Sequence, residues 1–325
     1  MIILIGIHSA FAMWNIPAGQ VLRLRRDFPE HTFIQASSDD ECRERIGAAE
    51  VAFMGHVTRP QLAAAARLRW IHSPAAGISG MLFPEMIASP IVLTNSRGMS
   101  ADTIAEHVLA VTLAMFRRLP EAFRYQSAKV WAQDAISLAG NRALAGSRIV
   151  IVGLGSIGRA VAQRMTALGA RVTGVRRNPG ADTDAVERVV GAEVLREVLN
   201  DADVVVVSAP HTRDTRSLIG AAELAAMPPH ALLVNVSRGP LVDEPALVQA
   251  LRSHAIAGAA LDVFNDEPLP PDSPFWTLPN VLITPHTSGL RADHWDAAVA
   301  LFSDNLRRFV SGQPLLNVVD KKAGY

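Results

Sequence analysis

Short apolar runs alternate with amphipathic stretches in the first hundred residues. The runs are rich in aliphatic and β-branched residues, which is typical of buried strands, and they cover 2–7, 51–54, 68–72 and, as a candidate fourth, 91–94. Helical periodicity between them is clearest at 18–27 and 59–67. Strands that alternate with helices predict a small parallel α/β unit.

The same alternation returns in the second half of the chain, after an apolar helical pattern at 102–125 that predicts one long helix. An amphipathic stretch at 293–309 predicts the last helix. Strand-like runs lie between these two helices at 149–152, 171–175, 204–208, 231–235, 257–261 and 281–284. Together they predict a second, doubly wound sheet of six parallel strands.

A G-x-G-x-x-G motif follows the first strand of this second group and precedes a helical stretch. Gly153, Gly155 and Gly158 carry the motif, and Ser156 and Ile157 lie inside it. The first glycine allows a tight turn, the second lets backbone approach a pyrophosphate, and the third lets helix and strand pack closely. The start of the helix offers N–H groups and a positive dipole end to phosphates. The motif predicts a dinucleotide site; the alternative is a glycine turn in an ordinary α/β protein.

The position of this motif in the middle of the chain predicts an inserted domain. We expect an α/β protein with two Rossmann-like domains, each built on a doubly wound parallel sheet. Residues 104–287 would form the dinucleotide-binding domain. Residues 1–103 and 288–325 would form a flavodoxin-like domain for the substrate.

Composition narrows the classes of function. The 325 residues are 49% hydrophobic and 19% charged, which suits a globular protein with two cores. Lys plus Arg and Asp plus Glu number 31 each, so no net field favours nucleic acid or an anionic membrane. Cys42 is the only cysteine, which excludes an intrachain disulfide and a cysteine-cluster metal site, and no metal site is predicted. The apolar N-terminus lacks the basic residues of a signal peptide, so a strand and a cytoplasmic location are expected.

Several segments occur in a specific order along nearly the whole chain: 73–77, 94–107, the glycine loop, 234–244, 260–268 and 283–289. In this combination the chain resembles the D-isomer-specific 2-hydroxyacid dehydrogenases. The segment Phe116-Arg117-Arg118 resembles their glyoxylate/hydroxypyruvate reductase branch. The resemblance implies an oxidoreductase that transfers a hydride between a nicotinamide cofactor and a 2-oxo acid or D-2-hydroxy acid. It also implies a homodimer.

Reduction of a 2-oxo acid needs a proton for the developing alkoxide and a cation for the carboxylate. His286 follows a sheet strand and can supply the proton as general acid. Glu267 is the carboxylate that the resemblance pairs with it. Arg238 follows another strand and has the planar fork that binds a carboxylate and stabilises charge on the carbonyl. Taken singly, they could be a loop-capping histidine, a solvated turn carboxylate, and an arginine paired with Asp243 or Glu244.

The resemblance also assigns binding roles. Ala76 and Gly77 would donate backbone N–H groups to the substrate carboxylate, although Ala75 stands where the family usually has glycine. Asp262 would accept a hydrogen bond from the nicotinamide amide, and its alternative is a helix or turn cap. The other predicted cofactor contacts, besides the glycine loop, are Pro210, Thr215, Val236, Ser237, Arg238, His286 and Ser288.

The residues after the strand at 171–175 favour NADP(H) over NAD(H). NAD-binding domains carry a carboxylate about 20 positions after the glycine motif, where it binds the ribose hydroxyls. Here Arg176 and Arg177 occupy that place, and Asp182 and Asp184 come several residues later. Two guanidinium groups would attract a 2′-phosphate. If they are merely solvated, the enzyme takes either cofactor.

Substrate size and assembly are less specified. The stretch 120–140 has aromatic residues that form either a dimer interface or ordinary core. A dinucleotide-sensing corepressor on the same scaffold is the alternative function. Formate enzymes of this fold are disfavoured, because they carry Gln where this chain has Glu267. Candidates for the pocket wall, without an order among them, are His8, Ala10, Phe11, Met13, Trp14, Arg97 and Trp131.

Overall fold

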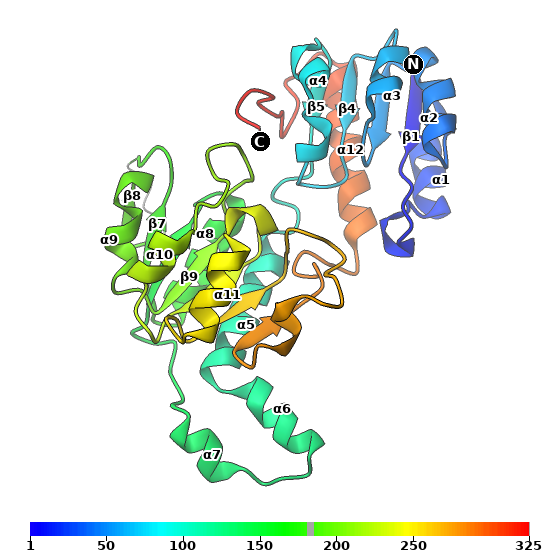
Figure 1. Ribbon diagram of the computed structural model, residues 1–325. Helices are drawn as coiled ribbons and strands as arrows, with labels where there is room; N and C mark the ends of the chain where they lie inside the picture. Colours follow the sequence, from blue (N-terminus) through cyan, green and yellow to red (C-terminus); the bar gives the residue numbers. More distant parts are fainter. Residues whose placement is uncertain (181–184, 325) are drawn as a thin grey trace. The chain divides into compact units, whose positions relative to one another are not determined.

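The computed structural model describes residues 1–180 and 185–324, and it divides into two compact units (Figure 1). Unit 1 consists of Met1–Met99 with Arg291–Tyr325, and unit 2 is Ser100–Leu290. No helix in the described ranges has both the length and the apolar character needed to cross a bilayer.

Unit 1 contains a parallel sheet in the order β2-β1-β3-β4-β5, which is the flavodoxin order. Its strands are β1 (Ile2–Gly6), β2 (Thr32–Gln35), β3 (Val51–Met54), β4 (Trp70–His72) and β5 (Val92–Thr94). The strand β2 was missed by sequence reasoning. It lies at the edge of the sheet, and of its four residues only Phe33 is buried, so it lacks an apolar run.

Both faces of this sheet are covered by apolar side chains. Ile3 and Ile5 pack on one face with Phe302, whereas Leu4 packs on the other, as the period of two in a strand requires. The rings of Phe53 and Phe302 stack with centroids 4.4 Å apart. The helices of unit 1 are α1 (Ala18–Asp27), α2 (Asp39–Arg45), α3 (Arg59–Ala64), α4 (Pro84–Ala88) and α12 (His294–Val310), with 3-10 turns at Ala12–Trp14, Ile46–Ala48 and Ser79–Met81.

Unit 2 contains a larger parallel sheet in the order β12-β11-β10-β9-β6-β7-β8. The expectation of six strands was one too low, because β8 is a short edge strand with no fully buried residue. The two sheets otherwise confirm the predicted fold class. The strands are β6 (Arg148–Val152), β7 (Arg171–Val175), β8 (Arg188–Val190), β9 (Val204–Val207), β10 (Leu232–Asn235), β11 (Gly258–Leu261) and β12 (Val281–Ile283).

The long helix predicted over 102–125 is interrupted. The first part, α5 (Ala101–Phe116), ends where Arg118 adopts φ 56° in the left-handed region, and α6 (Leu119–Ser127) starts immediately afterwards. Apolar periodicity alone does not predict such a break, because the spacing of apolar residues continues through it. The remaining helices of unit 2 are α7 (Gln133–Leu138), α8 (Ser156–Ala167), α9 (Leu195–Leu199), α10 (Ala221–Ala226) and α11 (Glu244–Arg252), with 3-10 turns at Ala192–Val194, Gly239–Leu241 and Pro274–Thr277.

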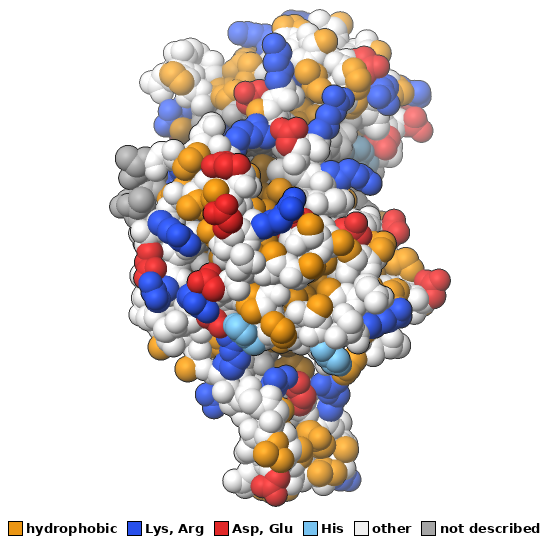
Figure 2. Space-filling view, turned by 60° about the vertical axis from the view of Figure 1, so that its left-hand side comes forward, with side chains coloured by type: hydrophobic (Ala, Val, Ile, Leu, Met, Phe, Trp, Pro, Cys, Tyr) orange, Lys and Arg blue, Asp and Glu red, His pale blue; other side chains and the backbone are white. Residues whose placement is uncertain are grey.

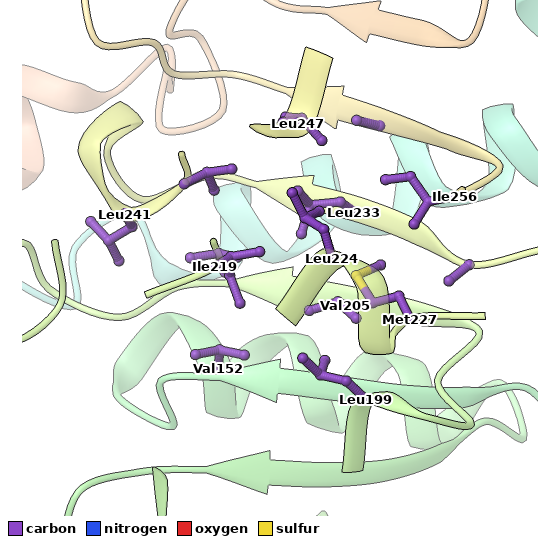
Figure 3. Packing of buried hydrophobic residues seen from close by; sticks show 14 of the residues in the cluster. Val152, Leu199, Val205, Ile219, Leu224, Met227, Leu233, Leu241, Leu247 and Ile256 are labelled. Carbon is purple, nitrogen blue, oxygen red and sulfur yellow. The ribbon is translucent and has the colours of Figure 1, made fainter. Parts of the chain in front are cut away.

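Alternate residues of the central strands enter two separate cores. Val150 and Val152 belong to one cluster, which Figure 3 shows with Leu233 and side chains of α10 and α11. Ile149 and Ile151 belong to the other cluster, together with residues of α5 and α8. A sheet packed on both faces in this way fixes the carboxyl ends of its strands, from which the candidate site is built.

Candidate active site

The predicted site residues of unit 2 lie in loops that leave one edge of its sheet. The strands are all parallel, so their carboxyl ends share this edge. The glycine loop follows β6, and Pro210 follows β9. Arg238 follows β10, Asp262 and Glu267 follow β11, and His286 follows β12.

His286 and Glu267 form a direct pair. Nδ1 of His286 lies 2.6 Å from Oε2 of Glu267, while Oε1 of the same carboxylate accepts a hydrogen bond of 2.9 Å from the backbone N–H of Phe264. The carboxylate is thereby held at both oxygens. With Nδ1 engaged in this way, Nε2 is the ring nitrogen that can exchange a proton with a substrate.

The backbone of His286 adopts φ 53°, which is uncommon for a residue other than glycine. Its N–H donates to the carbonyl oxygen of Asp262 at 2.9 Å, so the strained residue is held by the end of the neighbouring strand. Backbone strain of this kind persists only where the surroundings determine it, and it is frequent at active sites.

Asp262 organises the loop around His286. Its Oδ1 accepts from the hydroxyl of Thr284 at 2.6 Å and from the N–H of Thr287 at 2.9 Å, and Oδ2 accepts from the N–H of Ser288 at 3.0 Å. Burial would raise the pKa of this carboxyl, but these hydrogen bonds lower it below its ordinary value. The capping alternative is therefore realised at Asp262. The predicted contact to nicotinamide stays a prediction.

His107 of α5 extends this network, with Nε2 3.2 Å from the Thr284 hydroxyl. Burial lowers the pKa of the His107 imidazole, while the Asp262 charge opposes that shift. Sequence reasoning placed neither His107 nor Thr284 in the site. The sequence offered one signal for Thr284: it is a polar residue directly after an apolar strand, at the sheet edge where the site lies.

Arg238 is half-buried at the end of β10. Burial lowers the pKa of its guanidinium, and the charge of Glu267 opposes that shift. Nη1 donates to the carbonyl oxygen of Ser237 at 2.5 Å. The loop is fixed by Asn235, another residue the sequence did not single out: its Nδ2 donates to Arg238 O at 3.1 Å, and its Oδ1 accepts from Ser237.

The charges of Arg238 and His286 act on the carboxylate of Glu267. Burial would raise the pKa of the Glu267 carboxyl, but the hydrogen bonds from His286 and Phe264 and the charges of His286 and Arg238 lower it below its ordinary value. Glu267 is therefore a carboxylate at neutral pH, and it accepts from the ring of His286 at Nδ1. The arrangement brings together an imidazole, a carboxylate that contacts it and a cation.

The glycine loop has the geometry that its motif predicts. Gly153 adopts φ 102°, and a Cβ atom there would lie 2.4 Å from the backbone nitrogen of Ala209. At Gly158 a Cβ atom would lie 2.1 Å from the carbonyl oxygen of Gly153, which Ser208 also binds through its hydroxyl at 2.7 Å. Gly155, at the N-cap of α8, has no atom within 4 Å of its Cβ position. The loop therefore leaves space for a ligand at the N-terminus of α8, a helix of 12 residues, which fits a pyrophosphate.

Arg176 and Arg177 lie beside this loop. Val152 of β6 is paired with Val175 of β7, and Gly153 N donates to Val175 O at 2.8 Å, so both segments leave the sheet together. Nε of Arg176 donates to Asn178 O at 2.7 Å, and Nη2 of Arg177 lies 2.9 Å from an Asp214 oxygen. These cations are exposed or half-exposed, as a 2′-phosphate site requires.

The other predicted residues fall in three places. Thr215 closes its loop by donating to Pro210 O at 2.7 Å and accepting from Thr212 N at 2.8 Å. Val236, Ser237 and Ser288 are buried at the sheet edge. Ala76 and Gly77 belong to unit 1, where they are exposed in the loop after β4. Asp182 and Asp184 lie outside the described residues.

Comparisons with known proteins identify the family to which the chain belongs. The model of the NAD-binding domain of D-isomer specific 2-hydroxyacid dehydrogenases matches residues 109–288. A glyoxylate reductase of Korarchaeum cryptofilum is 34% identical over 266 residues, which are 80% of this chain and 78% of that protein.

Solved structures that cover essentially the whole chain include the following two. A D-isomer specific 2-hydroxyacid dehydrogenase family protein of Aeromonas salmonicida has a TM-score of 0.85 at 31% identity, over 98% of this chain and 99% of its own. A D-isomer specific 2-hydroxyacid dehydrogenase of Xanthobacter autotrophicus, solved in complex with NADPH and MES, has a TM-score of 0.84 at 30% identity, over 100% and 99%.

The doubly wound sheet and its glycine loop define a dinucleotide-binding protein, and the similarity defines the class as an NAD(P)-dependent oxidoreductase. The chain belongs to the D-isomer specific 2-hydroxyacid dehydrogenase family. The resemblance seen in the sequence is thereby confirmed, and within the family the chain is similar to glyoxylate reductases.

Proposed function

We propose that this protein reduces a small 2-oxo acid of the glyoxylate or hydroxypyruvate type to the 2-hydroxy acid, with NADPH as the preferred cofactor. The observation that carries the proposal is the 2.6 Å contact between His286 and Glu267 beside the half-buried Arg238, at the edge of the sheet that also holds the glycine loop. Similarity to glyoxylate reductases supports the choice of substrate class.

The cofactor, when bound, supplies a hydride to the carbonyl carbon. His286 donates the proton that the carbonyl oxygen needs, through Nε2, and takes it back in the reverse direction. Glu267 holds the imidazole by Nδ1, which orients the ring and leaves Nε2 for the substrate. Arg238 binds the substrate carboxylate and stabilises the negative charge that develops on the carbonyl oxygen. Ala76 and Gly77 are proposed as further donors, through their backbone N–H groups, to a carboxylate.

The preference for NADPH rests on Arg176 and Arg177. Both follow β7, at the position where an NAD enzyme needs a carboxylate for the ribose hydroxyls. A 2′-phosphate would compete with Asp214 for Arg177 and would gain a forked contact. The structural relative from Xanthobacter was solved with NADPH, which supports this choice.

We also propose that the enzyme is a homodimer that associates through α6 and α7. These helices extend away from the sheet of unit 2 (Figure 1), and Figure 2 shows hydrophobic side chains on that projection. Trp131 is 91% exposed, Leu138 87% and Phe123 61%. So much apolar surface on a projecting segment is typical of an interface, and a two-fold axis would let the same segment of each copy cover the other.

A spectrophotometric assay tests the proposal. NADPH oxidation is followed with glyoxylate, hydroxypyruvate, pyruvate and larger 2-oxo acids, and NADPH binding is measured separately by fluorescence. The proposal requires turnover with glyoxylate or hydroxypyruvate. The kcat/KM must be higher with NADPH than with NADH. Tight NADPH binding without turnover on any 2-oxo acid would refute it and would favour a dinucleotide sensor.

A further inference from the structure

Three side chains of unit 1 to which the proposed mechanism assigns no step converge at the carboxyl end of its sheet. His8 follows β1, His56 follows β3, and Asp39 is the first residue of α2. The strands β1 and β3 are neighbours, and β2, which precedes α2, lies on the other side of β1. In this strand order the direction of winding changes between β1 and β3, and open α/β sheets bind ligands at such a point.

The ligating atoms lie close together. Nε2 of His56 is 2.7 Å from Oδ1 of Asp39, and Nε2 of His8 is 3.6 Å from the same oxygen. The two imidazole rings are in edge contact, with centroids 5.3 Å apart. One atom from each of the three residues falls within 4.8 Å of the others. Ligands around a tetrahedral zinc ion, at about 2.0–2.1 Å from the metal, are about 3.3 Å from one another.

The carboxylate is held by a buried residue. Gln61 is 1% exposed, and its Nε2 donates to Oδ1 of Asp39 at 3.0 Å and to Asp39 O at 3.2 Å. Its Oε1 accepts from the N–H of Thr58 at 2.9 Å, which fixes the orientation of the amide. Metal sites characteristically have such outer partners, which orient the ligating carboxylate.

We propose that His8, Asp39 and His56 form a binding site for a divalent transition-metal ion, with zinc as the best match. Two imidazole nitrogens and one carboxylate oxygen are the donor set of open zinc sites, which keep the fourth position for water. The side chains are 21%, 54% and 44% exposed, so an ion can enter from solvent. A bound ion would link the ends of β1 and β3 to the start of α2.

Cys42 lies behind the cluster, with Sγ 3.9 Å from Nε2 of His8. Its Sγ is not among the ligand atoms that all lie within 4.8 Å of one another, so we leave the thiol out of the ligand set.

Calorimetric titration of the untagged protein with zinc chloride tests this site. The wild type is expected to bind one zinc ion per chain. Loss of an outer partner of a metal ligand weakens affinity by about 10- to 100-fold, so His56→Ala and Asp39→Asn should each weaken it by at least about 100-fold. Zinc should also raise the thermal unfolding midpoint of the wild type and not that of either variant.

His230→Ala is the matched control, because His230 also pairs with a carboxylate, that of Asp203 at 3.1 Å, but belongs to no such cluster among residues 1–180 and 185–324. It should bind zinc like the wild type. Circular dichroism of the metal-free variants shows whether they are folded. The proposal is overturned if zinc binds the wild type no more tightly than His56→Ala, or if the stoichiometric site is lost in His286→Asn instead.

Discussion

Gly239 lies where the loop that carries Arg238 meets the loop that leads to Glu267. A Cβ atom at this position would lie 2.0 Å from the carbonyl carbon of Phe264, 2.2 Å from its oxygen and 2.3 Å from the nitrogen of Asn265. Carbon atoms in contact are about 3.5 Å apart. Gly239→Ala must therefore move the two backbones apart by about 1.5 Å, because no side chain there can rotate away.

The loss of stability in Gly239→Ala follows from this displacement of backbone. Overpacking typically destabilises by about 1–3 kcal/mol, and we expect about 3 kcal/mol here because backbone must move. For a unit of this size the loss corresponds to a fall of about 6–12 °C in the unfolding midpoint. A shift of about 1 Å in reacting groups can cost about 100-fold in rate, so kcat/KM for glyoxylate should fall by about that factor.

Differential scanning calorimetry and steady-state kinetics with NADPH measure the two effects. Gly155→Ala is the control for stability, since its Cβ would have no atom within 4 Å and its φ is −82°. Its unfolding midpoint should stay within about 1 °C of the wild type. A Gly239→Ala variant with an unchanged midpoint and unchanged kcat/KM would refute the close packing of the loops that carry Arg238 and Glu267.

Three further predictions concern charge, cofactor and assembly. Glu267→Gln removes the carboxylate that holds Nδ1 of His286; a pair this exposed contributes about 1 kcal/mol, so kcat for reduction should fall by about fivefold, and an unchanged kcat would exclude the pairing as a contribution to the reaction. Because the pKa of Glu267 is lowered, its own protonation should reduce activity only below the usual glutamate range. Replacing Arg176 and Arg177 together by alanine should raise the KM for NADPH at least about tenfold more than that for NADH, and equal changes would argue against a 2′-phosphate contact. Trp131→Asp with Leu138→Asp should convert a dimer to a monomer by light scattering; a dimer that persists would place the interface elsewhere.

Apolar patterning predicted most of the fold, because most strands of both sheets are buried runs. The strands β2 and β8 escaped prediction since each lies at a sheet edge and carries few buried side chains. The break between α5 and α6 escaped for a different reason. It depends on the left-handed conformation of Arg118, which hydrophobic periodicity does not encode.

The sequence predicted the members of the candidate site that follow predicted strands. His286, Glu267 and Arg238 lie at the ends of neighbouring parallel strands, so their common location follows from the topology. The residues that hold them were not predictable. Asn235 and Thr284 act through hydrogen bonds across loops, and the His8, Asp39 and His56 cluster joins segments whose spacing in the chain carries no metal signature.

The most direct test of the central claim is the turnover of His286→Asn with glyoxylate and NADPH. Asparagine tolerates the left-handed conformation that His286 adopts, so the loop should be preserved. Loss of a general acid costs about 10²- to 10⁴-fold, and kcat should fall within that range while the Kd for NADPH, measured by fluorescence, stays within about threefold. An unchanged kcat with intact NADPH binding would contradict the role of His286 as the proton donor.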